Sequence, residues 1–334
     1  MVSRIPLNRG GHEQVTRGTR ARALPLVTAA GLFGRLTFLL CIAAYGNYAI
    51  AAEDKPASSL PVAEATAESA SSPESALDRR LAEEREAARQ RFAITTHKPN
   101  YLLFTYNASA NDRFEQLDAA EIKFQLSLKV SLAEDLLGGD IALAYTQVSF
   151  WQAFNSDISS PFRESNYEPE IMWRWVRPLR GDSLYNRAVV LGFVHQSNGR
   201  SEPLSRSWNR IYLNLIFEYQ NLYVSVKPWY RIPEEPKTGP TDSSGDDNPD
   251  IADYMGYGEV TAVWVQGKHR VGLMLRNNLD SNSNHGAIQL DWSYPLGNKM
   301  QVYVQYFNGY GESLVDYNHS VNRIGAGLML NNWL

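Results

Sequence analysis

The feature that most constrains this chain is an alternation of apolar and polar side chains that recurs over long stretches. From Ile122 to Ser131, every even-numbered residue is apolar and every odd-numbered residue is polar. The same alternation runs from Ile288 to Ser293, and it returns from Ile324 to Leu330 with glycines on the second face. Successive side chains of a β-strand point to opposite faces of the sheet, so this pattern predicts strands with one apolar face each. From about residue 98 onward, the chain is therefore predicted to be all-β.

Twelve such segments can be counted, and most are as long as the roughly 9–11 residues that a tilted strand needs to cross a bilayer. The connections after the first, third, fifth, seventh and eleventh segments are long, whereas most of the others are tight turns. Outer-membrane barrels show this asymmetry, with short periplasmic turns and longer outer loops. The segments lie near 98–107, 120–132, 140–150, 167–177, 185–197, 207–218, 221–231, 253–265, 269–277, 285–294, 300–308 and 321–333.

Two architectures fit alternating strands, a soluble sandwich and a membrane barrel. Sandwich strands are mostly about five or six residues long, shorter than these segments. Aromatic residues also gather at segment ends, as Trp229, Tyr230 and Trp264 do, which is typical of interfacial girdles. Backbone groups at an open sheet edge would stay unpaired in lipid, so a membrane-spanning sheet must close. We therefore predict a closed 12-stranded antiparallel transmembrane β-barrel with both termini in the periplasm.

The residues before the barrel divide into two parts. Residues 1–51 combine an arginine-rich start, an apolar core and a small-residue end, which predicts a cleaved signal peptide; the alternative is a membrane anchor. Residues 52–95 are predicted to be a flexible periplasmic extension, low in complexity at first and helical over 76–92, where the helix is expected to be solvated. Residues 96–334 form the predicted barrel domain. The single cysteine, Cys41, precedes the barrel, which excludes a disulfide framework. A net charge of −4 without a basic stripe argues against nucleic-acid binding.

Two candidate catalytic residues, His195 and Ser197, follow an apolar run at the end of the fifth segment. Residues two apart on a strand share a face, so an imidazole and a hydroxyl can meet there as base and nucleophile. Asn209 begins the sixth segment and can return opposite His195 in a hairpin. The three residue types form a Ser-His-Asn variant of the acyl-transfer triad, with an amide orienting the histidine.

Parity places all three residues on one side of the predicted barrel. The odd residues of the fifth and sixth segments are otherwise apolar, such as Phe193 and Ile211, and so face lipid. The set is expected near the outer leaflet, at the level of the acyl esters of membrane lipids. The alternative is that these are polar side chains at headgroup level, which are common at strand ends.

The motif around this set closely resembles the outer membrane phospholipase A family. The resemblance runs from about residue 98 to residue 334 and rests on several motifs in the family's order. These motifs are His195 to Ser201, Ser205 to Arg210, Tyr145 to Gln147, Ser160 to Glu164, Asn166 to Pro169, Lys227 to Tyr230, Asp246 to Asp250 and Gly309 to Leu314.

The resemblance implies a calcium-dependent outer-membrane enzyme of the phospholipase A1/A2 and lysophospholipase type, active as a homodimer and inactive as a monomer. Ser197 would be the nucleophile, His195 the general base and acid, and Asn209 the orienter of His195. The backbone N–H of Gly199 and calcium-bound water would hold the oxyanion.

The family pattern also implies where calcium would bind. It places the ion at the carbonyl of Arg200 and the hydroxyl of Ser205, with Ser159 supplied by the partner subunit. A second, weaker position would use Glu202 and Asp247. The family usually has aspartate where this chain has Glu202, so the second position depends on whether the longer side chain reaches the ion.

Gln147 points to dimerisation from the residues themselves. It lies between apolar neighbours on the lipid-facing side of the third segment, where its amide is expected to lack a partner unless a second subunit provides one. A twofold dimer would pair it with its own copy, and the alternative is that it reaches water at the interface.

Two other functions remain compatible with the sequence. One is a passive barrel, a porin or adhesin, which would need a water-filled lumen. The other is a related lipid deacylase or acyltransferase that uses the same chemistry on another acceptor.

Overall fold

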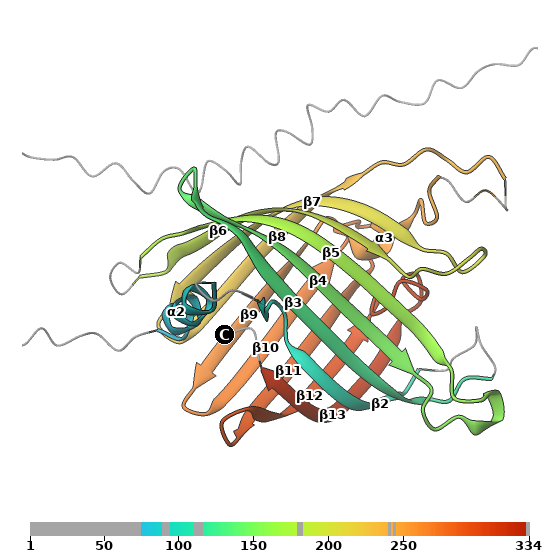
Figure 1. The fold of residues 1–334 in the computed structure, drawn as a ribbon. Helices are drawn as coiled ribbons and strands as arrows, with labels where there is room; N and C mark the ends of the chain where they lie inside the picture. The colour runs from blue at the N-terminus through green and yellow to red at the C-terminus, as the bar shows by residue number, and fades with distance from the viewer. Residues whose placement is uncertain are drawn as a thin grey trace, which may run out of the picture. The chain divides into compact units, whose positions relative to one another are not determined.

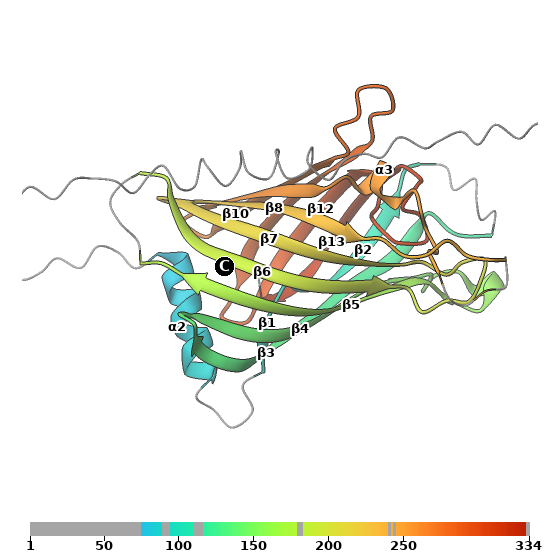
Figure 2. The same cartoon turned by 90° about the horizontal axis from the view of Figure 1, so that it is seen from above.

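A computed structural model describes residues 75–88, 94–109, 116–178, 183–239, 242 and 245–331. The predicted signal peptide, residues 1–51, and residues 52–74 of the predicted extension lie outside these residues. The described part folds into a sheet whose strands follow one another around a closed barrel (Figure 1 and Figure 2). The barrel closes because β3, which lies next to β1 at one end of the sheet order, also pairs with β4 at the other end. Every strand pairing is antiparallel.

The strands of the barrel agree closely with the predicted segments. They are β2 (Asn100–Asn107), β3 (Ala120–Leu136), β4 (Gly139–Trp151), β5 (Phe162–Val176), β6 (Tyr185–Ser197), β7 (Ser207–Tyr219), β8 (Leu222–Ile232), β9 (Gly258–Gln266), β10 (His269–Asn277), β11 (Gly286–Leu296), β12 (Met300–Gly309) and β13 (Val321–Asn331). The prediction of a closed 12-stranded barrel is confirmed. A further short strand, β1 (Ile94–Thr96), precedes β2 in the sequence and pairs with β3.

The largest differences from the predicted boundaries are at the starts of two segments. The eighth segment was expected to begin at residue 253, but Ile251–Met255 form the short helix α3 and β9 begins at Gly258. The helix ends at Gly256, whose positive φ of 64° turns the chain into the strand. β5 begins at Phe162, earlier than the expected residue 167, because the polar residues at its start pair with β4. The 3-10 helix η1 (Ser156–Ile158) lies in the loop that precedes β5.

The predicted faces are also present. On β7 the even-numbered side chains, such as Trp208 and Arg210, are buried in the lumen, whereas Ile211 on the odd face is 44% exposed. Phe193 on the odd face of β6 is 41% exposed. Apolar residues on the outside of a membrane barrel face lipid, so the apolar stripe is the hydrophobic belt that the sequence predicted.

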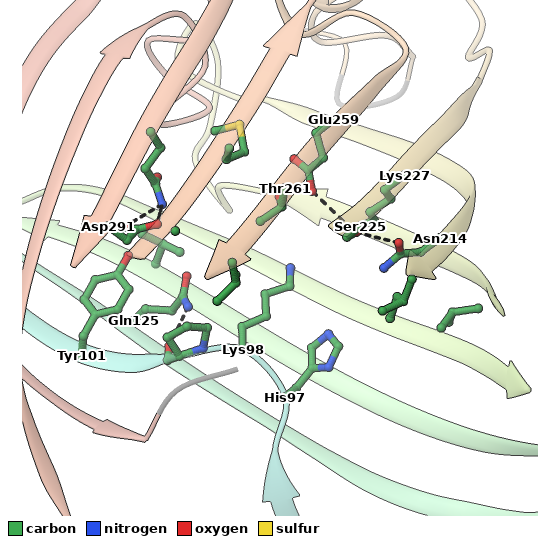
Figure 3. Close-up of a pocket in the computed structure, with 18 of the residues that line it drawn as sticks. His97, Lys98, Tyr101, Gln125, Asn214, Ser225, Lys227, Glu259, Thr261 and Asp291 are labelled. Carbon is green, nitrogen blue, oxygen red and sulfur yellow. Dashed lines mark hydrogen bonds and ion pairs between the residues drawn. The ribbon is translucent and has the colours of Figure 1, made fainter. Parts of the chain in front are cut away.

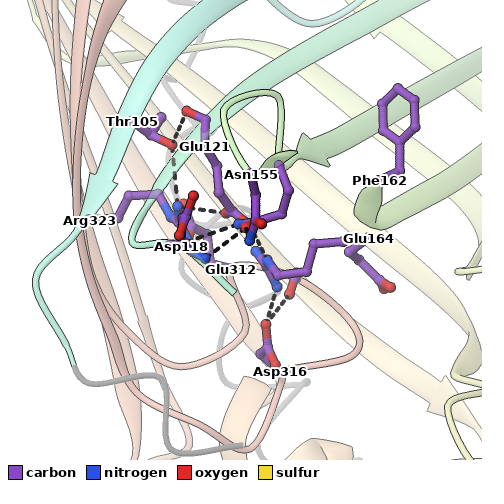
Figure 4. A network of polar contacts seen from close by, with 12 residues as sticks. Thr105, Asp118, Glu121, Asn155, Phe162, Glu164, Glu312, Asp316 and Arg323 are labelled. Atoms are coloured by element: carbon purple, nitrogen blue, oxygen red, sulfur yellow. Dashed lines mark hydrogen bonds and ion pairs between the residues drawn. The ribbon is translucent and has the colours of Figure 1, made fainter. Parts of the chain in front are cut away.

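Charged side chains fill much of the lumen. Glu121 lies between Arg163 and Arg323, at 2.6 Å and 2.8 Å, and Glu312 joins Arg323 to Lys123, at 2.7 Å and 3.0 Å (Figure 4). A cavity of about 450 Å³ remains, and it is lined largely by polar side chains of the strands together with residues that precede β2 (Figure 3). Part of the lumen is therefore filled by an internal ion-pair network.

The helix expected to be solvated instead lies against the end of the lumen that carries the short turns (Figure 1). It is α2 (Ala76–Ala88), whose Leu77 and Leu81 pack with Tyr223 and Val263 of the barrel. These leucines are four residues apart and share a helical face, which is enough apolar surface for docking.

Ion pairs hold the same helix to the barrel wall. Glu84 binds Lys129 and Arg174 at 2.6 Å and 2.7 Å, and Asp78 pairs with Arg187. Neither α2 nor α3, the helices of the described residues, is long and apolar enough to cross a membrane.

Candidate active site

The candidate site begins with the pairing of two neighbouring strands. β6 and β7 pair so that His195 lies opposite Asn209 and Ser197 lies opposite Ser207. The imidazole Nδ1 of His195 is 2.9 Å from Oδ1 of Asn209. The predicted hairpin is therefore present, and its register brings the histidine and the amide into direct contact.

Ser197 lies on the same lipid-facing side, at the end of β6. Its Cα is two residues from that of His195, about 7 Å along an extended strand, and an imidazole spans much of that distance. Among the contacts of the described residues, none joins the Ser197 hydroxyl to the ring. Catalytic hydrogen bonds are often long or absent before substrate binds, so this geometry is compatible with a nucleophile and its base.

The loop that follows Ser197 is built around Asn198, a residue for which no role was predicted. The buried Asn198 side chain accepts hydrogen bonds from the backbone N–H groups of Arg200 and Arg206, at 3.3 Å and 3.0 Å, and donates to the carbonyl of Leu204 at 2.8 Å. The Asn-Gly pair at 198–199 is a turn signal that could have identified it. Asn198 therefore fixes the loop immediately after the candidate nucleophile.

Gly199 adopts a backbone that favours glycine. Its φ is +63°, and a Cβ at this position would lie 3.3 Å from a ring carbon of Tyr167. The described hydrogen bonds occupy the N–H groups of Asn198 and Arg200 but not that of Gly199. A free N–H two residues after the candidate nucleophile has the character of an oxyanion-hole donor.

Arg200 anchors the loop to the neighbouring strand. Its guanidinium donates to the carbonyl oxygens of Phe162 and Arg163, and its Nε lies 3.3 Å from a carboxylate oxygen of Glu164. The sequence had singled out only the backbone carbonyl of Arg200. The side chain holds that carbonyl in place, because it ties the loop to the start of β5.

Oxygen donors for a cation gather beside this loop. The hydroxyls of Ser205 and Ser207 donate to one carboxylate oxygen of Asp247, at 2.7 Å and 3.2 Å. Lys237 places its ammonium between Asp247 and Glu202 and forms an ion pair with each. Partial burial raises the pKa of Asp247, but hydrogen bonds from Lys237, Ser205 and Ser207 outweigh that effect and lower it below its usual value.

These donors fit a calcium ion in chemical type. Calcium binds oxygen ligands from carboxylates, hydroxyls and carbonyls. The structure joins Ser205, expected at the first calcium position, to Asp247, expected at the second, and Asp247 shares Lys237 with Glu202. No group of three or more acidic, histidine or cysteine side chains forms a metal site within the described ranges. At Glu202 and Asp247, calcium would have to displace the ammonium of Lys237.

The two residues expected at a subunit contact lie in β4 and in the connection between β4 and β5. Ser159 follows η1 with a positive φ of 62°, and no described contact joins it to Ser205 or Arg200 of its own chain. Gln147 accepts a hydrogen bond from Tyr145 at 3.2 Å and donates to Ser149 at 3.0 Å. The expectation that its amide lacks a partner within the chain is wrong, because neighbours on the same face of β4 supply two.

A glutamate completes the surroundings of the histidine. Nδ2 of Asn209 donates to Oε1 of Glu234, at 3.0 Å, from the segment that follows β8. Neither Glu234 nor Lys237 was singled out from the sequence. Both lie in a connection without strand or helix periodicity, so no local pattern marks them.

Comparisons with known proteins agree with this geometry. The family model described as Phospholipase A1 matches residues 77–330, so the match begins within α2. A phospholipase A1 of Escherichia coli is 40% identical over 249 residues, covering 72% of this chain and 82% of that protein. A phospholipase A1 of Proteus vulgaris is 38% identical with the same coverage.

Solved structures of the same kind are similar in fold. An outer membrane phospholipase A from Escherichia coli has a TM-score of 0.66 and 38% identity, covering 73% of this chain and 100% of that one. A Salmonella typhi outer membrane phospholipase dimer with bound calcium has a TM-score of 0.66 and 37% identity, covering 75% and 97%.

Proposed function

This chain belongs to the phospholipase A1 family, and on that premise we propose that His195, Ser197 and Asn209 carry out its reaction. The protein is a β-barrel phospholipase of the bacterial outer membrane. The single observation that supports the proposed residues best is the 2.9 Å contact between His195 Nδ1 and Asn209 Oδ1 on the lipid-facing side of the barrel. On that side, near the outer leaflet, the three residues can contact the acyl ester of a phospholipid, so the substrate does not need to enter the lumen.

The contact assigns a role to each atom. An amide oxygen only accepts, so Nδ1 of His195 carries the proton and Nε2 is free to act as base. Nε2 takes the proton of the Ser197 hydroxyl as its oxygen attacks the ester carbonyl. The bond to the glycerol oxygen then breaks, and His195 returns the proton to that oxygen, which leaves with the lysophospholipid. Water deacylates Ser197 by the same steps in reverse order.

The Gly199 N–H would stabilise the negative charge that develops on the carbonyl oxygen. Donors preorganised for an oxyanion contribute about 10²- to 10³-fold each to kcat. The positive φ of Gly199 and the anchored side chain of Asn198 hold this N–H in a fixed loop. The oxyanion donor is therefore supplied by the same turn that follows the nucleophile.

Calcium is proposed as the cofactor. The carbonyl of Arg200 and the hydroxyl of Ser205 would hold it, with Ser159 of a second copy, and Glu202 and Asp247 would form a weaker position. When bound, calcium adds positive charge beside the reacting ester. Support comes from the gathering of hard oxygen donors around Ser205 and Asp247 and from the calcium-bound dimer of the Salmonella typhi relative.

A homodimer is proposed as the active form, with the monomer inactive. Gln147 lies on the lipid-facing side of β4, and Ser159 lies in the loop that joins β4 to β5, so one twofold contact could involve both residues. Chemical cross-linking with and without calcium tests this proposal. Calcium should increase the dimer fraction in the native chain, and Gln147→Leu should lower that fraction. An unchanged monomer under both conditions would contradict it.

The test of the proposed residues is the variant Ser197→Ala. It should abolish fatty-acid release from phospholipid while the barrel still folds, as judged by the heat-dependent shift of a folded barrel on a denaturing gel. Ser201→Ala, in the exposed part of the same loop, is the matched control and should retain activity. Full activity of Ser197→Ala would exclude Ser197 as the nucleophile. Product analysis of the native enzyme separates hydrolysis from acyl transfer.

A further inference from the structure

The amide of Asn209 is held from both sides. Its oxygen contacts His195 Nδ1 at 2.9 Å, and its nitrogen donates to the Glu234 carboxylate at 3.0 Å. We propose that Glu234 is a positioning residue for the reaction. It fixes the orientation of the Asn209 amide and places a negative charge on the far side of that amide from His195. This inference rests on the proposed function of His195, Ser197 and Asn209.

The orientation of the amide decides the chemistry of the histidine. A carboxamide is nearly symmetric in shape, and turning it over would place its NH2 group against Nδ1 of His195. That arrangement would favour the tautomer with its proton on Nε2, which cannot accept the serine proton. An ionised carboxylate only accepts hydrogen bonds, so Glu234 keeps the NH2 group of Asn209 on its own side. The oxygen must then face His195, and Nε2 stays free.

The charge of Glu234 has a second effect. His195 becomes an imidazolium when it takes the serine proton, and a nearby negative charge favours that form. Glu234 does not touch the ring, but its hydrogen bond polarises the Asn209 amide and strengthens the acceptor that does. An amide triad backed by a glutamate therefore regains part of the electrostatic support that a triad carboxylate would supply directly.

The local backbone is suited to holding Glu234 in place. Asn209 and Ile232 are partners in the pairing of β7 with β8, and Glu234 follows Ile232 by two residues. Pro233 and Pro236 flank the glutamates of this segment and restrict its φ angles. The carbonyl of Glu235 accepts a hydrogen bond from the backbone N–H of Asp246 at 2.8 Å, which ties the segment to the rest of the loop. Glu234 itself is half-buried.

The first measurement compares Glu234→Gln, Glu234→Ala and Glu235→Ala as a function of pH, at saturating calcium. Glutamine keeps an acceptor for the amide but loses the charge, so kcat should fall about three- to tenfold with KM unchanged. Alanine loses both effects and should lower kcat further. The apparent pKa of the acidic limb should fall in both Glu234 variants. Glu235 is the exposed neighbour, and its variant should match the native enzyme. An unchanged pH profile in Glu234→Ala would overturn the proposal.

A double-mutant cycle separates this role from general stabilisation of the loop. If Glu234 acts through Asn209, Glu234→Ala should cause no further loss of kcat in an Asn209→Ala background. The converse variant, Asn209→Asp, places two carboxylates in contact, so adding Glu234→Gln should raise its activity. Equal losses from Glu234→Ala in both backgrounds would assign Glu234 a merely structural role.

A third measurement does not depend on turnover. In the Ser197→Ala protein, the His195 imidazole can be titrated by NMR after isotope labelling of histidine. Glu234→Gln should lower its pKa, and Glu235→Gln should not. This measurement separates failure of the proposed nucleophile from failure of the role of Glu234. If the Ser197→Ala protein were still active but Glu234→Gln lowered the pKa of His195, Ser197 would be refuted as the nucleophile and the coupling of Glu234 to His195 would stand. The absence of a shift would refute the role of Glu234.

Discussion

Lys237 supplies a sensitive test of the proposed calcium position. Its ammonium pairs with Glu202 and Asp247, the two acids that would bind the second calcium, so an internal cation competes with the metal. The variant Lys237→Met removes the charge and keeps most of the side-chain volume. We expect it to bind calcium more tightly than the native chain.

The magnitude follows from the exposure of the partners. The side chains of Lys237, Glu202 and Asp247 are 17%, 28% and 9% exposed, so these are partly solvated ion pairs. Such pairs are worth about 0.2–1 kcal/mol each, and two of them together about 0.4–2 kcal/mol. Calcium affinity should therefore rise about 2- to 30-fold when the competitor is removed.

Calorimetric titration of calcium into detergent-solubilised Ser197→Ala protein measures this affinity without turnover. Lys268→Met is the matched control, because Lys268 is exposed in the tight turn between β9 and β10. Its affinity should equal that of the parent, and Asp247→Asn should cancel the gain from Lys237→Met. Unchanged or weaker binding by Lys237→Met would refute the reasoning that Lys237 occupies a calcium position.

Three further predictions concern the loop and the helix. Gly199→Ala forces alanine into a left-handed backbone that disfavours it by about 1–2 kcal/mol, so the N–H should be displaced and kcat should fall about tenfold with little change in KM; unchanged kcat would contradict the claim that this glycine backbone positions the oxyanion donor. Leu81→Asp buries a charge at the docked face of α2, so amide hydrogen exchange over residues 75–88 should become faster. Ala82→Asp, on the exposed face, should leave that exchange slow, and equal exchange in the two variants would contradict docking. Burial raises the pKa of Glu84, but Lys129 and Arg174 outweigh it and lower the pKa below its ordinary 4.5, so docking should be strongest above pH 4.5 and weaken as pH falls further. Protection factors over the helix, which correct exchange for its intrinsic pH dependence, should therefore fall on acidification; Arg80 also contacts this carboxylate, and protection factors that rise would reverse the sign of the argument.

The barrel could be predicted because its constraints are periodic. A strand that faces lipid on one side and a filled lumen on the other alternates strictly, and the hairpin of β6 and β7 follows from that alternation and a short loop. The contact of His195 with Asn209 was predictable for the same reason, since register and parity together place two residues opposite each other.

The remaining features depend on contacts that leave no periodic trace. Glu234 and Lys237 act from an irregular connection whose path is set by the residues it touches. The docking of α2 combines ion pairs with two buried leucines within a charged helix, too few apolar residues for an amphipathic signal. The pairing of Gln147 with Tyr145 and Ser149 depends on side-chain rotamers, which residue spacing does not specify.

The most direct test of the central claim is to locate the nucleophile. A fluorophosphonate should label the purified protein in the presence of calcium, and peptide mapping should place the label on Ser197, with little labelling after calcium is chelated and none in Ser197→Ala. A label on another residue, or no label in the active preparation, would contradict the proposed Ser-His-Asn site on the outside of the barrel.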